Sequence, residues 1–341
     1  MRLNGTGFQG IIGHRNVIRH LTDAMQSGRI SHAYLFTGED GSGKRMMADA
    51  FAMALVCRDK SRPAPCLICP SCRKAADHNH PDILYVMHEK PNLLSVDEIR
   101  TQVVNTVEIR PYESEYKIYI IADAEKMNPQ AQNALLKTIE EPPSYAVIIL
   151  LTSRPEALLP TIHSRCVTLP LLPVPDREVD EYLRREVHLP DYEARMLTAF
   201  AQGNIGKAVL AATDGAFAER RERTLQLIRN LPKMDSAAIG EIVRQWKEDR
   251  EHTADRLDLI QMWFRDVLCY KATYEIDQLI FSGEISAIRA QASGTSYEGL
   301  SEILSAVDRC RMRLAANVNF ELAAELLLYT IRDECHSRGE M

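Results

Sequence analysis

The sequence predicts an α/β domain with a five-stranded parallel sheet, followed by a chain that is helical to its end. Three observations support this prediction. A glycine-rich loop at 38–44 stands between a short apolar run and a segment with helical periodicity. Further apolar runs alternate with helical patterns, which is typical of parallel strands covered on both faces. After the proline-rich segment 169–175 no strand-like run follows, so we expect a domain boundary there.

The composition is that of a globular protein with two or three domains. The chain has 341 residues, 45% of them hydrophobic and 26% charged. No apolar run reaches the roughly 18 residues of a membrane span, and the N-terminus lacks a signal-peptide core, so we expect a cytoplasmic protein. A net charge of −6 argues against coating nucleic acid by charge alone. In the cytoplasm, the eight cysteines are not expected to form disulfides.

The elements of the first domain are expected in an order that alternates strand and helix. A helix over 95–107 has a clear start, because Ser95 is followed three residues later by Glu98. The prolines at 142–143 end the helix before them. We expect strands at 33–36, 82–87, 117–122, 147–152 and 166–169, and helices at 8–31, 46–55, 95–107 and 128–140.

The remainder is expected to divide into a small and a large helical part. We place an α/β P-loop domain at 1–171, a helical lid at 172–214 and an all-helical domain at 215–341. Two apolar stripes in the last part are assigned to core packing. They consist of Leu257, Ile260, Phe264 and Leu268, and of Leu300, Ile303, Leu304, Val307, Cys310 and Leu314.

The loop at 38–44 matches a phosphate-binding P-loop in its required context of strand, loop and helix. Glycines let backbone N–H groups converge on phosphate oxygens, and a lysine reaches the terminal phosphates. Candidate nucleotide-binding residues are Gly38, Gly41, Ser42, Gly43, Lys44 and Arg45. Arg45 departs from the pattern, since a Ser or Thr hydroxyl for Mg²⁺ is expected there. ATP with Mg²⁺ is therefore a possible cofactor, and a glycine-rich turn without nucleotide is the alternative.

Four cysteines follow the P-loop helix within sixteen residues and form a candidate zinc knuckle over 57–72. Two C-x-x-C steps share one cysteine, which suits the four-thiolate tetrahedral set of a structural Zn²⁺ site. The ligands expected are Cys57, Cys66, Cys69 and Cys72. Three nearby histidines are expected at the surface: His78, His80 and His88.

An acidic residue follows the third expected strand. Asp123 would bring a carboxylate next to the P-loop metal site. The position where a hydrolysing enzyme needs a glutamate to orient water holds Ala124, and losing such a base typically costs ~10²–10⁴ in rate. The alternative is that Asp123 is an ordinary polar strand end.

Four stretches together resemble the clamp-loader family of bacterial DNA polymerase III, of the AAA+ class. They are 32–36, the four-cysteine segment, 133–143 and 164–166. The similarity extends from about Gly10 to the C-terminus and is strongest over 10–170. It implies an AAA+ core, a helical lid and a helical collar that assembles a ring of five subunits.

The resemblance also implies roles for single residues. The family has ATPase subunits, gamma and tau, and a partner that does not hydrolyse ATP. This chain matches the non-hydrolysing partner better, because Arg45, Ala124 and Gly206 stand where the ATPase subunits carry Thr, Glu and a lid arginine. Arg165 matches the arginine that reaches a neighbouring subunit's ATP in trans, and Thr152 matches the first sensor.

The implied function is assembly with gamma/tau and delta in a five-subunit ring that loads the sliding clamp on primer–template DNA. The chain would then be part of a nucleotidyltransferase holoenzyme, with weak or no ATPase activity of its own. Two alternatives remain open. One is an ATP-hydrolysing subunit of the gamma/tau type, and the other is a structural scaffold with no nucleotide site.

Overall fold

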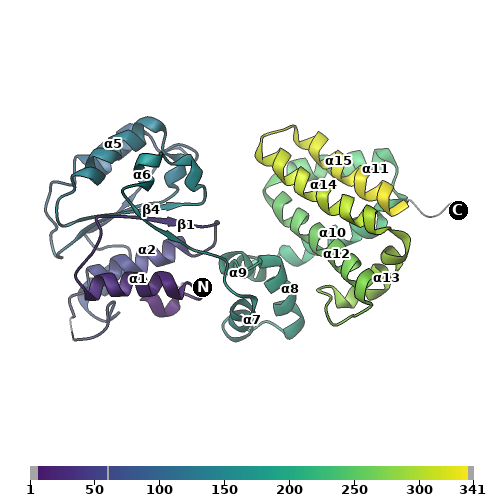
Figure 1. The fold of residues 1–341 in the computed structure, drawn as a ribbon, viewed down its shortest axis with the longest axis horizontal. Helices are drawn as coiled ribbons and strands as arrows, with labels where there is room; N and C mark the ends of the chain where they lie inside the picture. Colours follow the sequence, from purple (N-terminus) through teal and green to yellow (C-terminus); the bar gives the residue numbers. More distant parts are fainter. Residues whose placement is uncertain (1–6, 60, 337–341) are drawn as a thin grey trace. The chain divides into compact units, whose positions relative to one another are not determined.

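The computed structural model describes residues 7–59 and 61–336. Its first part is built on a single sheet of five parallel strands in the order β2-β3-β4-β1-β5, which confirms the expected fold class (Figure 1). Each strand boundary lies within one residue of its expected position. The strands are β1 (Ala33–Thr37), β2 (Ile83–Val86), β3 (Lys117–Ile121), β4 (Ala146–Thr152) and β5 (Val167–Pro170).

Helices cover both faces of this sheet. Helices α1 (Arg15–Gln26) and α2 (Lys44–Leu55) lie on one face, and α5 (Pro129–Glu140) lies on the other (Figure 1). Alternate residues of β1 follow this division, since Tyr34 packs edge-on against Phe51 of α2 with ring centroids 5.0 Å apart, whereas Leu35 belongs to the α5 side of the core. The central strands are therefore buried on both faces, as their continuous apolar runs predict.

The helix expected over 8–31 is shorter than predicted. A 3₁₀ turn at Gly7–Gly10 precedes a break, and α1 begins only at Arg15. Gly13 in the break has a φ of +72°, and a Cβ there would lie 2.7 Å from Val174 Cγ2. The tight contact with Val174 and the left-handed backbone thus interrupt a pattern that apolar periodicity alone does not distinguish from helix.

The segment 95–107 starts as predicted and then changes its winding. Ser95 caps α4 (Val96–Ile99), and Glu98 completes the capping box. The chain continues as a π-helix at Arg100–Val104 instead of a regular α-helix. Two further short helices belong to this part, α3 (Pro70–Ala76) and α6 (Pro160–His163).

The described residues after β5 contain only helices. They are α7 (Asp176–Arg185), α8 (Asp191–Ala201), α9 (Ile205–Thr213), α10 (Phe217–Asn230), α11 (Ser236–Glu248), α12 (Thr253–Thr273), α13 (Ile285–Gly294), α14 (Tyr297–Ala315) and α15 (Phe320–His336). Helix α12 packs against α10, α13 and α14, and its Trp263 is fully buried. Among the described helices, none combines the length and apolarity needed to cross a membrane.

Two compact units emerge from the packing. One comprises the described residues through Val179 together with Gly203–Lys207, and the other comprises Asp180–Gln202 and the described residues from Ala208 onward. Two short pieces of the expected lid, 172–179 and 203–207, therefore belong to the sheet-containing unit. The division into three parts at 171 and 214 stays a prediction.

A buried carboxylate holds the start of β2 in place. Asp82 is fully buried and accepts hydrogen bonds from the backbone N–H groups of Tyr112, Glu113 and Ser114 at 2.6 to 2.9 Å, and from the Ser114 hydroxyl at 3.0 Å. Burial raises the pKa of Asp82, but these four donors outweigh burial and hold the pKa below its usual value.

His80 beside it is buried, with 3% of its surface exposed, so the prediction of a surface histidine is wrong. Its Nε2 lies 2.7 Å from the Ser71 hydroxyl and its Nδ1 accepts from the Asp82 N–H at 3.1 Å. Both ring nitrogens are therefore satisfied without water.

We expect Asp82→Asn to lower the free energy of unfolding by about 2–3 kcal/mol at pH 7, because an amide cannot accept all the donors of a carboxylate. Since the folded pKa is depressed, the carboxylate stabilises above its unfolded pKa of about 3.9, and the stabilisation is lost as the pH falls below that value. Urea unfolding at pH 7 and at pH 3 measures both effects.

Glu156→Gln provides the matched control, since it makes the same chemical change at an exposed carboxyl. Equal stability of the two variants at pH 7 would contradict the role given to Asp82.

Candidate functional site

The residues expected to bind nucleotide gather at the carboxyl edge of the sheet. Gly38 directly follows β1, Thr152 ends the neighbouring β4, and Asp123 lies two residues beyond β3. The Gly38 N–H donates to the Thr152 carbonyl at 3.2 Å. Parallel pairing brings these ends together, so the sheet positions the loop at the crevice where α/β proteins bind ligands.

Each carbonyl of the loop from Gly38 to Ser42 accepts a hydrogen bond. The Lys44 ammonium donates to the carbonyls of Gly38 and Glu39 at 2.6 and 2.8 Å. Of the other three carbonyls, that of Asp40 accepts from Asn204 Nδ2 at 2.7 Å, that of Gly41 from the Gly206 N–H at 3.1 Å and that of Ser42 from His14 Nε2 at 3.0 Å. With 11% of its side chain exposed, Lys44 is held by its own loop.

The loop meets the start of α9 at a distance that only glycine permits. A Cβ on Gly206 would lie 2.5 Å from the Gly41 carbonyl oxygen and 2.7 Å from its Cα. Gly41 itself has a φ of +84°, and a Cβ there would lie 2.7 Å from Asn204 Oδ1. The sequence indicated only that position 206 lacks the lid arginine of the ATPase subunits. In the structure, the absence of a side chain at Gly206 leaves room for the loop.

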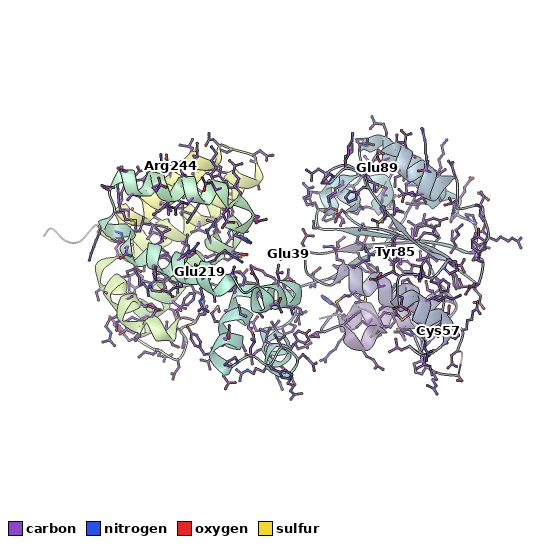
Figure 2. The ribbon with its side chains drawn as sticks, turned by 180° about the vertical axis from the view of Figure 1, so that it is seen from behind. Glu39, Cys57, Tyr85, Glu89, Glu219 and Arg244 are labelled. Carbon is purple, nitrogen blue, oxygen red and sulfur yellow. The ribbon has the colours of Figure 1, made fainter. Side chains whose placement is uncertain are left out.

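Arg45 points toward the edge strand β2. Its Nε lies 3.2 Å from Asp49 Oδ1, and its guanidinium stands 4.3 Å from the ring centre of Tyr85. Tyr85 is labelled in Figure 2. The Tyr85 hydroxyl donates to the same Asp49 oxygen at 3.0 Å. The residue at the expected Mg²⁺-ligand position is therefore engaged by a carboxylate and an aromatic face.

Asp123 is paired with a lysine from its own loop. Lys126 Nζ lies 2.8 Å from Asp123 Oδ2, and His88 Nε2 lies 3.7 Å from the same oxygen. Burial raises the pKa of Asp123, but Lys126 and His88 outweigh burial and hold the pKa below its usual value. Ala124 is fully buried in the core and offers no polar group. Glu125 lies beside it and accepts from the Ser153 hydroxyl at 2.7 Å.

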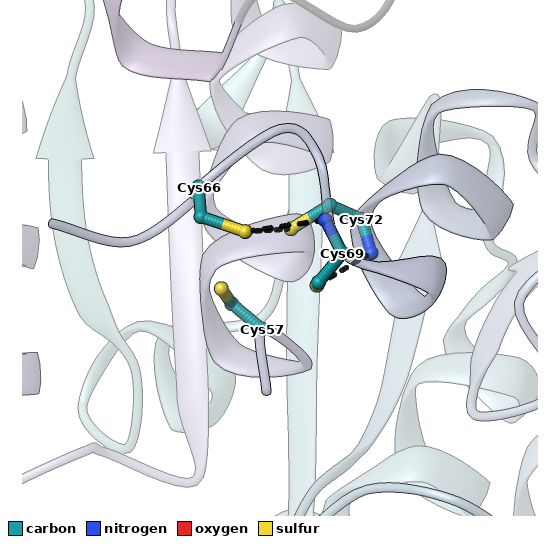
Figure 3. Close-up of side chains that lie close together, drawn as sticks. All are labelled: Cys57, Cys66, Cys69 and Cys72. Atoms are coloured by element: carbon teal, nitrogen blue, oxygen red, sulfur yellow. Dashed lines mark hydrogen bonds between the residues drawn. The ribbon is translucent and has the colours of Figure 1, made fainter. Parts of the chain in front are cut away.

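The four cysteines expected to bind metal are brought together. Their sulfurs all lie within 4.8 Å of one another, and Cys66 Sγ and Cys72 Sγ are 3.9 Å apart (Figure 3). Cys57 lies two residues after α2, and Cys69 and Cys72 flank the start of α3. The backbone N–H groups of Cys69 and Cys72 each donate to the cysteine sulfur three residues earlier at 3.4 Å. All four are free thiols.

The geometry of this cluster fits a metal ion. With Zn–S bonds of ~2.3 Å, tetrahedral thiolates stand roughly 3.8 Å apart, close to the Cys66–Cys72 separation. Burial raises the pKa of Cys69. Hydrogen bonds from the backbone N–H groups of Cys72 and Arg58, and from the thiols of Cys66 and Cys72, outweigh burial and lower the pKa to about 6. Burial raises the pKa of Cys72. The cluster can hold a metal such as zinc.

Arg165 lies at the amino-terminal ends of the strands, on the opposite side of the sheet from the P-loop at their carboxyl ends. It comes two residues before β5, and Val167 pairs with Tyr34 near the start of β1, whereas the P-loop follows the end of β1. The length of β1 separates the two edges by roughly 15 Å. With 37% of its side chain exposed, Arg165 pairs with Glu140 at 2.8 Å.

Sequence reasoning missed several residues that contact these sites. His14, Lys126 and Glu140 each bond to a candidate residue. Asn204 bonds to the Asp40 carbonyl within the P-loop. Lys126 is near enough in sequence to Asp123 for a local pair to be anticipated, and Asn204 carries a local signal because its Oδ1 accepts from the Lys207 N–H at 3.0 Å. His14 and Glu140 meet their partners only through the tertiary fold.

The sheet order, the loop after β1 and the helices after β5 together define a P-loop protein of the AAA+ class. Residues 13–175 match the family described as "DNA polymerase III, delta subunit". Residues 216–333 match "DNA polymerase III, delta subunit, C terminal".

The chain is 31% identical to DNA polymerase III subunit delta′ of Bacillus subtilis over 321 residues, which cover 93% of this chain and 95% of that protein. It is also 31% identical to subunit tau of Escherichia coli over 216 residues, covering 62% of this chain and 33% of tau. A gamma subunit-related protein from Thermotoga maritima overlaps structurally with a TM-score of 0.45 at 22% identity, covering 93% of this chain and 99% of that one. The chain belongs to the delta′ subunit family of the DNA polymerase III clamp loader.

We expect Gly206→Ala to displace the P-loop, because the new Cβ would overlap the Gly41 backbone. Overpacking of this kind costs about 1–3 kcal/mol. Hydrogen–deuterium exchange of residues 38–44 would become faster, and the melting temperature would fall.

Gly240→Ala in α11 is the control, since a Cβ there meets nothing within 4 Å and Ala in a helix is favoured over Gly by roughly 0.5–1 kcal/mol. Unchanged exchange of residues 38–44 in Gly206→Ala would show that the contact does not hold the loop.

Proposed function

We propose that this chain serves as the non-hydrolysing subunit of a clamp loader built with gamma/tau ATPase subunits and a delta subunit. In this role it donates Arg165 in trans to a neighbour's ATP and helps to load the sliding clamp on primer–template DNA. Family membership supports the assembly, and the arrangement of the two edges of the sheet supports the role of Arg165.

The position of Arg165 is the observation that carries the proposal. It lies across the sheet from its own P-loop, which supports a role at another subunit's nucleotide rather than at its own. The arginine is half-exposed, so a partner can reach it. An arginine that stabilises the charge developing on a transferred phosphoryl group is worth ~10³–10⁵ in rate.

The chain's own loop supports weak or absent hydrolysis. Lys44 is bound by the loop carbonyls, Arg45 by Asp49 and Asp123 by Lys126. A nucleotide with Mg²⁺ needs a free lysine, a hydroxyl and a carboxylate at these three positions. Binding would have to break existing pairs, and no glutamate stands at 124 to orient water.

The knuckle supports a structural Zn²⁺ site. Cys57, Cys66, Cys69 and Cys72 would hold the ion as four thiolates, which leaves no open position for chemistry. The metal would join the segment after α2 to the start of α3, and so fix a loop in which the described residues, 57–59 and 61–69, form no helix or strand.

We expect Arg165→Ala to lower the ATP turnover of the assembled loader by about 10³-fold, because the neighbour's transition state loses its positive charge. Assembly, followed by size-exclusion chromatography, should stay intact, since the side chain is at the surface. Turnover equal to that of the unaltered loader would refute the role in trans.

ATP turnover of the isolated chain is the necessary companion measurement. The isolated chain should not turn over ATP, and Lys44→Ala should change nothing. Robust turnover that Lys44→Ala removes would favour the alternative of an ATP-hydrolysing subunit.

We expect one zinc per chain by metal analysis. Cys69→Ser should reduce the zinc content and lower the melting temperature, because binding free energy of a structural metal contributes to folding. Cys269→Ser, outside the cluster, is the control and should keep its zinc. An unchanged melting temperature after the metal is removed from the chain would contradict a structural site.

A further inference from the structure

The guanidinium of Arg165 contacts three groups of its own subunit. Its Nη2 lies 2.8 Å from Glu140 Oε1, and its Nη1 donates to the Thr161 carbonyl at 3.1 Å and to the Ser164 hydroxyl at 3.2 Å. The backbone beneath it is held by α6, since the N–H groups of Arg165 and Cys166 both donate to the Ile162 carbonyl at 3.1 Å. The side chain can therefore swing out while its backbone stays in place.

Glu140 is the one charged group in this set, and helix stability does not explain it. It is the last residue of α5, where a carboxylate faces the negative end of the helix dipole and is disfavoured. Lys137 lies one turn earlier on the same helix, yet the ion pair joins Glu140 to Arg165. A locally unfavourable residue that contacts a functional side chain is a candidate for a functional role.

We propose that Glu140 is a positioning residue that holds Arg165 against its own subunit until a neighbour's nucleotide competes for it. The proposal rests on the function in trans put forward above. The retracted arginine would keep turnover low in the assembled loader before clamp and DNA are bound, and release would follow when the subunits close.

The strength of the pair suits a reversible contact. Both side chains are open to water, with 37% of Arg165 and 44% of Glu140 exposed. Pairs this exposed shift an equilibrium by about twofold to fivefold. A phosphate carries more charge than a carboxylate and forms stronger bonds with arginine, so a correctly placed nucleotide can displace Glu140, whereas water or a misplaced neighbour cannot do so as effectively.

The first test measures the contact without any catalysis. In the isolated chain, phenylglyoxal should modify Arg165 about twofold to fivefold faster in Glu140→Gln than in the unaltered protein, as followed by peptide mass analysis. Glu141→Gln is the matched control, because it neutralises the adjacent exposed carboxyl, which forms no ion pair among the described residues. Equal modification rates in the three proteins would overturn the proposal.

The second test measures the consequence in the complete loader. Glu140→Gln should raise basal ATP turnover about twofold to fivefold, and should leave turnover with clamp and primed DNA nearly unchanged, so that the stimulation ratio falls. Glu141→Gln should behave as the unaltered loader, and adding Arg165→Ala to Glu140→Gln should remove the gain. If Glu140 only stabilised the fold, Glu140→Gln would lower basal and stimulated turnover together.

The outcomes separate this proposal from the one on which it rests. Glu140→Gln could speed the modification of Arg165 without changing turnover, while Arg165→Ala keeps full activity. This result would mean that Glu140 holds Arg165 but that Arg165 does not act in trans. A loss of basal turnover in Glu140→Gln, with Arg165→Ala inactive, would mean that Arg165 acts in trans but that Glu140 orients rather than retracts it.

Discussion

Parallel strand pairing is the constraint on which this molecule depends. It brings the carboxyl ends of β1, β3 and β4 to one edge, where the P-loop, Asp123 and Thr152 meet. The same pairing brings the residues before β5 to the other edge. Burial of the sheet on both faces makes this geometry costly to change, since shifting a strand would move its apolar side chains out of two cores at once.

The two edges differ in how their polar groups are satisfied. At the P-loop edge, the lysine, the arginine after it and the aspartate are all engaged by groups of the same unit, and Gly206 closes the loop from the side of α9. At the opposite edge, Arg165 is held by a single exposed carboxylate and two neutral acceptors. The first arrangement favours a fixed, self-contained loop, and the second favours an arginine that exchanges partners.

Much of this could be predicted from the sequence because the signals are local. Each strand is a continuous apolar run, and each was found within one residue. The four cysteines are close in sequence, so their convergence needs little help from the fold. Two predictions were wrong because distant contacts decide the outcome. The contact of Val174 with Gly13 delays the start of the entry helix to Arg15, and Ser71 and Asp82 hold His80 in a buried position.

The sequence by itself determined the parallel sheet, the P-loop and the cysteine cluster, because apolar runs, glycine spacing and thiol spacing report directly on backbone and ligand chemistry. The tertiary structure alone decided what those groups contact. Asn204 and Gly206 contact the P-loop from more than 160 residues away, and Glu140 contacts Arg165 from the end of α5. Such contacts join residues that are distant in the sequence and are brought together only by the fold, so no local sequence pattern predicts them.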